Sequence, residues 1–160
     1  MWGTNATGTN TSGPLSYRPT EDVTDPLVIP HPDVEGDYRI IADTANLTYT
    51  VSPVTSVLYL LGDATTAGWT NTAPLVMTKV SPGKFSITTT LTAGGMKFLE
   101  VPGQWAPQWG TDATGTSTGG VLVYRATESV PDPTNIPSPG AGTYTITVNL
   151  ATQTYTIVAK

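Results

Sequence analysis

The sequence predicts an all-β protein built on an antiparallel, Ig-like β-sandwich. Three observations support this fold class. Short segments alternate apolar and polar residues, as strands with one buried face do. Turn-forming residues separate these segments, with 16 glycines and 14 prolines among 160 residues. No window places apolar residues at the i, i+3, i+4, i+7 spacing of an amphipathic helix. About seven short strands over roughly 100 residues is the pattern of a β-sandwich.

The clearest expected element is a hairpin near the C-terminus. Residues 142–150 place Tyr144, Ile146 and Val148 on one face and threonines on the other, and residues 153–158 alternate in the same way. The short link between them favours antiparallel pairing of the two segments. The other expected strands are residues 57–62, 75–78, 84–91, 96–101 and 121–124.

An internal repeat is the second feature of the sequence. Trp2 and Trp109 lie 107 positions apart, and one extra residue near Val34 changes the offset to 106 further along. Matching pairs include Gly3/Gly110, Thr4/Thr111, Gly8/Gly115, Tyr17/Tyr124, Arg18/Arg125, Asp25/Asp132, Ile29/Ile136, Tyr38/Tyr144, Ile40/Ile146 and Tyr49/Tyr155. We therefore expect residues 1–52 to be the C-terminal half of a repeated β-sandwich module and residues 53–160 to be a complete copy.

A half-sandwich of about 50 residues buries little surface and leaves open sheet edges. Three arrangements would complete it. Chain that precedes residue 1 could supply the other half. Residues 1–52 could dock on the first half of the complete module in place of 109–160. Exchange with another molecule could give a swapped dimer or a head-to-tail fibre; if the 160 residues are the whole ordered species, exchange is the favoured arrangement.

Composition and charge argue against several classes of ligand. Only 12% of the residues are charged and the net charge is −5, whereas nucleic acid and anionic membranes attract clustered lysine and arginine. The longest apolar run, residues 57–61, is too short to span a bilayer. No signal-peptide pattern follows Met1; either the protein stays inside the cell or, the favoured expectation, a leader lies outside this sequence. Cysteine is absent, which excludes thiolate chemistry, and we expect neither a cofactor nor a metal.

Several motifs occur in order along residues 53–160. They are residues 62–69 ending in Gly-Trp, residues 73–77, the Met-Lys-Phe of 96–98, the Trp-Ala-Pro-Gln-Trp-Gly of 105–110 and the closing hairpin. In this combination the chain resembles the SusE/SusF outer-membrane proteins, which are surface glycan-binding lipoproteins of bacterial starch-utilisation systems. The resemblance implies tandem carbohydrate-binding β-sandwich modules, starch-like α-glucan as the ligand, and an extracellular or outer-membrane location. Residues 1–52 would then be the tail of a preceding module.

Four residues are the candidate carbohydrate contacts: Trp69, Lys97, Trp105 and Trp109. A sugar ring presents C–H faces bordered by hydroxyls, and tryptophan offers a flat apolar surface with an N–H donor. A lysine ammonium donates to ring hydroxyls. Trp69 and Trp105 lie in loop-like stretches, which favours exposure, whereas Trp109 recurs as Trp2 and is equally compatible with a repeated core anchor. Lys97 is expected on the sheet face opposite to its two apolar neighbours.

Other polar residues favour structural interpretations. Arg18 and Arg125 are each followed three residues later by a glutamate, which favours an ion pair over a ligand contact. The acids Glu100, Asp63 and Asp112 are scattered, while glycoside hydrolysis needs two carboxylates on either side of the scissile bond. We therefore expect no enzyme activity.

The leading hypothesis is a non-catalytic polysaccharide-binding module. The rival is an extracellular structural protein that assembles into fibres or swapped oligomers by exchange of residues 1–52. A third reading, an ice- or mineral-binding threonine face, is disfavoured because the threonines are irregularly spaced.

Overall fold

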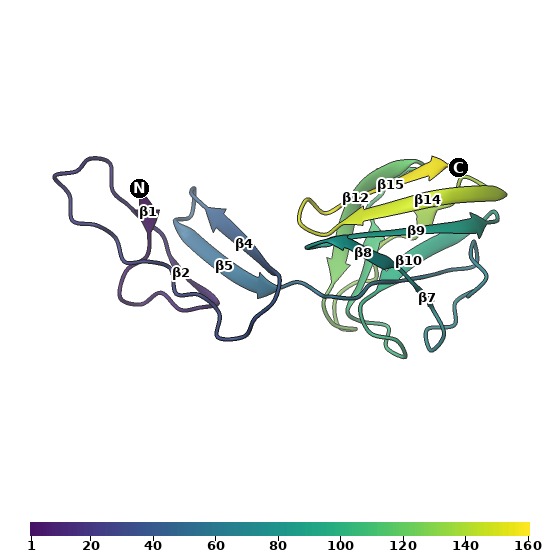
Figure 1. The fold of residues 1–160 in the computed structure, drawn as a ribbon, viewed down its shortest axis with the longest axis horizontal. Helices are drawn as coiled ribbons and strands as arrows, with labels where there is room; N and C mark the ends of the chain where they lie inside the picture. The colour runs from purple at the N-terminus through teal and green to yellow at the C-terminus, as the bar shows by residue number, and fades with distance from the viewer. The chain divides into compact units, whose positions relative to one another are not determined.

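The computed structural model describes residues 1–160 and consists of strands and connecting loops (Figure 1). The all-β class predicted from the sequence is confirmed. The chain forms two compact units, Met1–Val54 and Thr55–Lys160, here called the first and the second unit. The division falls two residues after the expected position because strand β5 (Thr48–Pro53) continues through Pro53. No helix has the length and hydropathy needed to cross a membrane.

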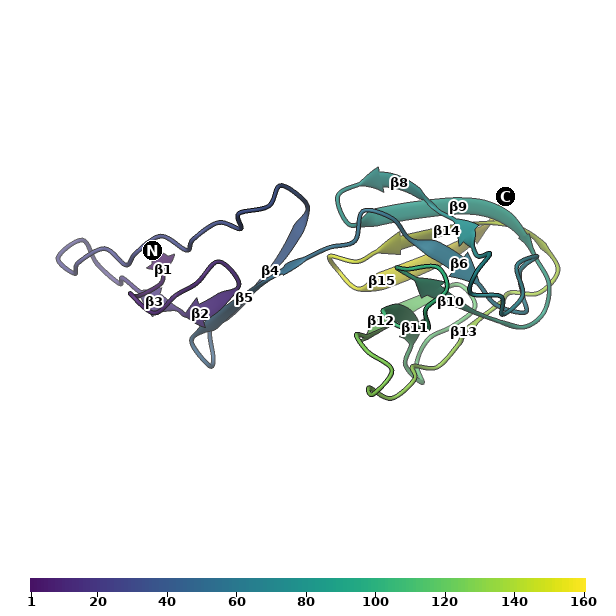
Figure 2. The ribbon, with the colours of Figure 1, turned by 90° about the horizontal axis from the view of Figure 1, so that it is seen from below.

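The second unit is an antiparallel β-sandwich. Its strands are β6 (Tyr59–Leu61), β7 (Leu75–Val76), β8 (Thr78–Ser81), β9 (Lys84–Leu91), β10 (Gly95–Leu99), β11 (Gln108–Thr111), β12 (Gly119–Arg125), β13 (Ile136–Pro137), β14 (Gly142–Asn149) and β15 (Thr154–Ala159). They are hydrogen-bonded in the order β7-β6-β10-β11-β12-β15-β14-β9-β8, with β13 beside β10. Figure 2 separates the layers, with β8, β9, β14 and β15 on one side and β10 to β13 on the other.

Strand β12 connects the two layers. Its first residues, 119–121, pair with β15, and its remaining residues, 122–125, pair with β11. The strand therefore leaves one sheet and enters the other, as strands at sandwich corners do. Because β12 ends in the layer that contains β10 and β11, it delivers Arg125 to the same end of that layer as Gln108, its register partner.

The core lies between the two layers. The expected hairpin is confirmed as β14–β15, with Ile146 opposite Ile157 and Val148 opposite Tyr155. Alternation along β14 places Ile146 and Val148 inward, where neither is exposed. Leu58, Leu60, Leu61, Phe85, Leu91, Met96, Phe98, Leu99 and Ile136 are also fully buried. Burial of each such side chain stabilises the fold by about 1.5–3 kcal/mol, so this core holds the loops of the site in place.

Strands β8, β11 and β13 were not among the predicted strands. The case of β11 has a clear physical reason. All four of its residues are buried, so the apolar–polar alternation that marks a half-exposed strand is missing. Its pairing with β10 and β12 depends on segments that lie elsewhere in the sequence.

The first unit contains strands β1 (Trp2–Gly3), β2 (Ser12–Pro14), β3 (Ser16–Tyr17), β4 (Tyr38–Asp43) and β5. Strand β1 pairs with β3, and the other three form a sheet in the order β2-β5-β4. Leu15, Tyr49 and Val51 form a small core, against which Ile29 and Tyr38 pack. This core is much smaller than that of the second unit.

Candidate functional site

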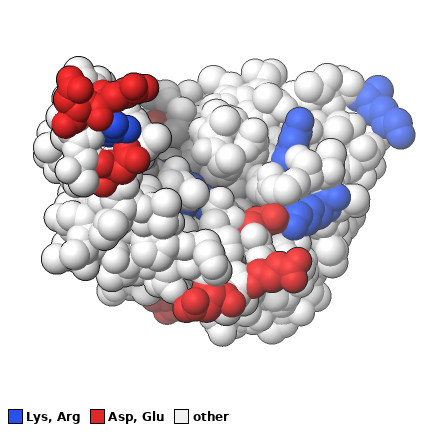
Figure 3. All heavy atoms as spheres, turned by 60° about the vertical axis from the view of Figure 1, so that its left-hand side comes forward, with Lys and Arg blue, Asp and Glu red and all other residues white.

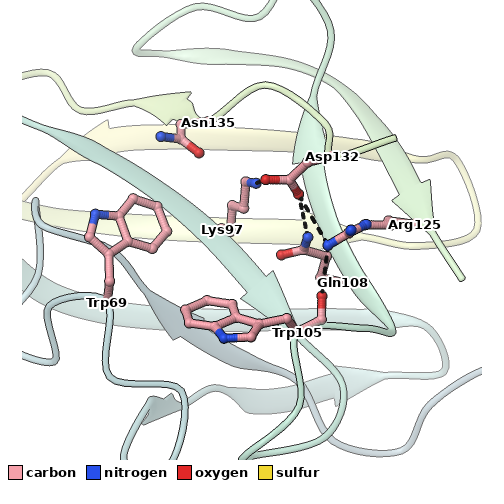
Figure 4. A pocket seen from close by; sticks show the side chains of 7 residues that line it. All are labelled: Trp69, Lys97, Trp105, Gln108, Arg125, Asp132 and Asn135. Atoms are coloured by element: carbon pink, nitrogen blue, oxygen red, sulfur yellow. Dashed lines mark hydrogen bonds and ion pairs between the residues drawn. The ribbon is translucent and has the colours of Figure 1, made fainter. Parts of the chain in front are cut away.

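A pocket of about 280 Å³ opens on the surface of the second unit (Figure 4). Its volume is just below the ~300–1,000 Å³ typical of ligand sites. Its walls come from the loops after β6 and β10, from strands β10, β11 and β12, and from the segment that precedes β13. The lining residues are Trp69, Lys97, Trp105, Gln108, Arg125, Asp132 and Asn135.

Two tryptophans form one side of the pocket. Trp69 lies in the loop after β6 and Trp105 in the loop after β10, and each side chain is 37% exposed. Figure 4 shows both indoles on the same side, facing the polar side chains. The two loops are tied together by the backbone N–H of Gly103, which donates to the carbonyl of Asn71 at 2.8 Å. The two aromatic surfaces are therefore held by one connected piece of backbone.

The turn before Trp69 is rigidly built. The N–H of Gly62 donates to the carbonyl of Gly68 at 2.8 Å, and the buried hydroxyl of Thr65 donates to the carbonyl of Gly62 at 2.9 Å. Gly62 has a φ of +137° and lies so close to β10 that a Cβ there would be 2.1 Å from the carbonyl oxygen of Gly95. Only glycine fits this position, and the tight approach sets where the Trp69 loop begins.

The opposite side of the pocket is a polar cluster centred on Asp132. The Lys97 ammonium, on a side chain that is only 5% exposed, lies 2.6 Å from Asp132 Oδ2. Arg125 Nη1 lies 3.6 Å from Asp132 Oδ1, and Gln108 Nε2 donates to that same oxygen. One carboxylate thus faces two cations. Because a buried ammonium without an anion is strongly unfavourable, Asp132 supplies the partner that the buried Lys97 side chain requires.

The structure corrects the expected pairing of Arg125 with the Glu128 carboxylate. Arg125 Nη2 donates instead to the backbone carbonyl of Glu128 at 2.9 Å, and its Nε donates to the carbonyl of Val130 at 2.8 Å. The loop after β12 therefore wraps around the guanidinium. A further bond of 3.4 Å from Nη1 to the carbonyl of Trp105 links this cation to the aromatic side of the pocket.

Gln108 contributes an acceptor that the protein leaves unused. Its side chain is 1% exposed, and Oε1 is buried with no hydrogen-bond partner. The amide nitrogen is committed to Asp132, so the amide oxygen points elsewhere. A buried acceptor without a donor costs about 1–3 kcal/mol. A ligand hydroxyl or a water that reaches this oxygen would recover that free energy.

Trp109 is placed in the core and not in the pocket. It is 5% exposed, its ring lies 4.5 Å from that of Tyr124 at an interplanar angle of 37°, and its indole N–H donates to Glu100 Oε1 at 2.8 Å. Burial raises the pKa of Glu100, and this hydrogen bond opposes the shift. The expected carbohydrate contact through Trp109 is therefore not supported by the geometry, because β11 is covered on both faces.

Three of the four residues named from the sequence thus meet in one pocket: Trp69, Lys97 and Trp105. Lys97 is itself buried, as are both its neighbours on β10, so it is a buried lysine under the pocket and not one on a solvated strand face. The sequence reasoning missed Gln108, Arg125, Asp132 and Asn135. One signal was present: an arginine followed seven residues later by an aspartate occurs in both copies of the repeat.

Comparison with known families gives an independent result. A family model described as SusF/SusE starch-specific carbohydrate-binding modules matches residues 57–156. This range covers nearly the whole second unit and none of the first. A comparison with curated proteins found no match. The resemblance inferred from the motifs is confirmed.

Proposed function

The chain belongs to the SusF/SusE family of starch-specific carbohydrate-binding modules, and from this premise we propose that the second unit binds a starch-like α-glucan in the pocket between Trp69, Trp105 and Lys97. The observation that carries the proposal is the pairing of two half-exposed tryptophans with a buried, charged polar cluster in one pocket. Binding occurs without chemical change of the glycan.

The aromatic side supplies most of the binding free energy. The C–H face of a glucose ring packs on an indole plane, and each stacked ring contributes about 1–3 kcal/mol through its buried apolar area. Trp69 and Trp105 belong to different loops that share a backbone hydrogen bond, so both surfaces are in place before the ligand arrives. After the cost of association, two such contacts give a dissociation constant of about 10⁻⁶ to 10⁻³ M.

The polar side supplies orientation. The Lys97 ammonium has three donors, and the structure shows one of them directed at Asp132. A lysine donor next to a carboxylate acceptor matches a pair of adjacent ring hydroxyls, one of which accepts while the other donates. The amide of Asn135 offers a further partner among the lining residues, and the unused Oε1 of Gln108 lies buried in the pocket wall. A glycan seated on the tryptophans would thereby be fixed in rotation.

The proposal does not include catalysis. Asp132 is the one carboxylate among the lining residues, whereas glycoside hydrolysis uses two that flank the scissile bond. Asp132 is also engaged with two cations and an amide. Glu100 is committed to the indole of Trp109. The face of the molecule in Figure 3 is largely uncharged, with the charged side chains in a few small groups, which suits a neutral polymer. We place the module at the cell surface, where it meets polysaccharide too large to enter the cell.

Affinity electrophoresis in gels containing amylopectin tests the proposal. The wild-type chain should be retarded relative to its migration without polysaccharide. Trp69→Ala and Trp105→Ala should each migrate as if the polysaccharide were absent. Trp2→Ala is the matched control, because Trp2 is 45% exposed but belongs to the first unit; it should keep the wild-type retardation. Free migration of the wild type, or wild-type retardation of both pocket variants, would refute the proposal.

The alternative function is self-assembly into swapped oligomers or fibres by exchange of residues 1–52. It is favoured by the exposed apolar side chains of the first unit, which include Trp2, Ile40 and Val28. Light scattering of the purified 160-residue chain over a range of concentrations tests it. A mass that rises with concentration would support assembly, and a monodisperse monomer would remove this alternative.

A further inference from the structure

We infer that the first unit is an acceptor for a half-module, a segment with the same strands as residues 55–108. Binding of this segment completes a second β-sandwich module. The family match does not extend to residues 1–54. The two units of this chain nevertheless share a repeat and corresponding strands.

The first unit reproduces the hydrogen bonds of residues 109–160 at the repeat positions. The N–H of Thr4 donates to Leu27, and that of Thr111 donates to Thr134, both at 2.8 Å. The Tyr49 hydroxyl donates to the carbonyl of Thr9 at 2.6 Å, and that of Tyr155 donates to Thr116 at 2.7 Å. The Thr4 hydroxyl donates to the carbonyl of Pro14 and the Thr111 hydroxyl to that of Val121, at 2.8 Å each. Leu47 and Gln153, which also correspond, have positive φ angles of 53° and 52°. Residues 1–54 are therefore folded as the second half of a module.

Two strands of the first unit lack a neighbour that their counterparts have. Strand β4 pairs only with β5, whereas its counterpart β14 lies between β15 and β9. Strand β1 pairs only with β3, whereas β11 lies between β12 and β10. Both vacant positions correspond to strands from the first half of the complete module. Such open edges accept an added strand through main-chain hydrogen bonds.

Side-chain exposure marks the same vacancy. Ile40 is 64% exposed, while its counterpart Ile146, which lies opposite Ile87 of β9, is fully buried. Trp2 is 45% exposed, while Trp109, which lies opposite Phe98 of β10, is 5% exposed. The apolar residues of the first unit are therefore exposed where the second unit covers them with β9 and β10.

Counting half-modules identifies the occupant. Each chain contains one first half, residues 55–108, and two second halves, residues 1–54 and 109–160. When copies exchange segments, residues 55–108 of one chain only change which second half they cover. Every assembly of this chain alone therefore leaves one second half per chain, either 1–54 or 109–160, uncovered. Exchange of residues 1–52, the arrangement favoured from the sequence and the alternative function above, therefore gains no closed module. The occupant is an additional segment with the strand pattern of residues 55–108, from outside these 160 residues.

The completed module would also hold part of a second glycan site, an extension that rests on the proposed function. Arg18 and Asp25 are the counterparts of Arg125 and Asp132 and are already paired at 2.5 Å. The counterparts of both pocket tryptophans and of Lys97 all belong to the missing half. Val28 stands where the second unit has Asn135, so the second site would lack one amide.

An extended chain tests the inference. Residues 55–108 are repeated directly before Trp2, in place of Met1, so that the added copy joins Trp2 as Gln108 joins Trp109. Hydrogen exchange of β4 is followed by mass spectrometry. We expect β4 to exchange at least about tenfold more slowly than in the 160-residue chain, because its open edge becomes paired. Equal exchange of β4 in the two chains would overturn the inference.

Two neighbouring substitutions make the test specific to the predicted register. Ile40→Asp places a charge where the counterpart Ile146 is fully buried, whereas Ile41→Asp places it where the counterpart Thr147 is partly exposed. In the extended chain Ile40→Asp should abolish the added protection of β4 and Ile41→Asp should retain it. In the first unit alone Ile40 is 64% exposed and Ile41 is 43% exposed. These exposures by themselves would make Ile41→Asp the more disruptive substitution. Equal behaviour of the two variants would count against the inference.

Titration with a soluble maltooligosaccharide separates this inference from the proposed function. The 160-residue chain should bind at one site and the extended chain at two. Added protection of β4 with a single glycan site would support the completed module and overturn the second site. Failure of both chains to bind glycan, with added protection present, would refute the proposed function and leave the acceptor supported.

Discussion

Replacing Trp109 with phenylalanine separates its structural role from a role in ligand binding. The phenyl ring retains most of the contact with Tyr124 but loses the indole N–H that donates to Glu100 at 2.8 Å. Hydrogen bonds to charged groups contribute about 1.5–3 kcal/mol. The smaller ring also leaves a gap in a strand that is buried on both faces, which adds roughly 1 kcal/mol. The expected loss in free energy of unfolding is therefore about 2.5–4 kcal/mol.

Urea unfolding followed by circular dichroism measures this loss. With a urea dependence of about 2 kcal/mol per molar for a unit of this size, the midpoint should fall by roughly 1–2 M. Amylopectin affinity electrophoresis under native conditions should show wild-type retardation, because Trp109 does not line the pocket.

The matched control is Trp69→Phe. Its side chain is 37% exposed in the pocket, so the midpoint should hardly change while the retardation weakens. The reasoning fails if Trp109→Phe abolishes retardation at an unchanged midpoint, since that result would make Trp109 a ligand contact and not a core residue.

Three further predictions concern the stability of the second unit. Burial raises the pKa of Glu100 above its usual 4.5, so the folded state holds this proton more tightly than the unfolded state, and wild-type stability falls as the pH rises from about 4.5 through the raised pKa. Glu100→Gln removes this pH-dependent loss of stability, so the urea midpoint of the variant minus that of wild type should increase between about pH 4 and about pH 7. A difference in midpoint that does not change with pH would contradict the raised pKa of Glu100. Gly110→Ala would place a Cβ 2.5 Å from the carbonyl oxygen of Thr134, and we expect thermal denaturation to show a loss of about 1–3 kcal/mol. Asp132→Asn leaves the buried Lys97 ammonium without its anion, and should cost about 1–3 kcal/mol, because the carboxylate is partly exposed; adding Lys97→Met should restore much of the stability, and no restoration would refute the pairing.

Local pattern was sufficient for much of the fold. The β14–β15 hairpin alternates with a period of two, and its short link permits only antiparallel neighbours, so the prediction held residue by residue at Ile146 and Val148. Strand β11 was missed because burial on both faces removes the alternation on which such predictions depend. The repeat was visible as matched residues, but the open edges of β1 and β4 were located only when the pairing of each strand was known.

The candidate site divides in the same way. Residue type, loop context and family resemblance were enough to single out Trp69, Lys97 and Trp105, because aromatic surfaces and ammonium groups bind sugars wherever they are exposed to them. The cluster around Asp132 was not predictable, because it joins Lys97 of β10, Gln108 of β11 and the segment after β12. Which charges compensate one another depends on distances of a few ångströms between segments far apart in the chain.

The sequence by itself determined the fold class, the repeat and the family, since each rests on residue order and periodicity. Only the tertiary structure decided that Trp105 lines the pocket and that Trp109 belongs to the core. The two are identical residues four positions apart, yet one is 37% exposed beside a pocket and the other is 5% exposed against Tyr124. The reason is that β11 begins between them at Gln108. Burial of a side chain on a strand is decided by the layers that cover it, and these come from the whole chain.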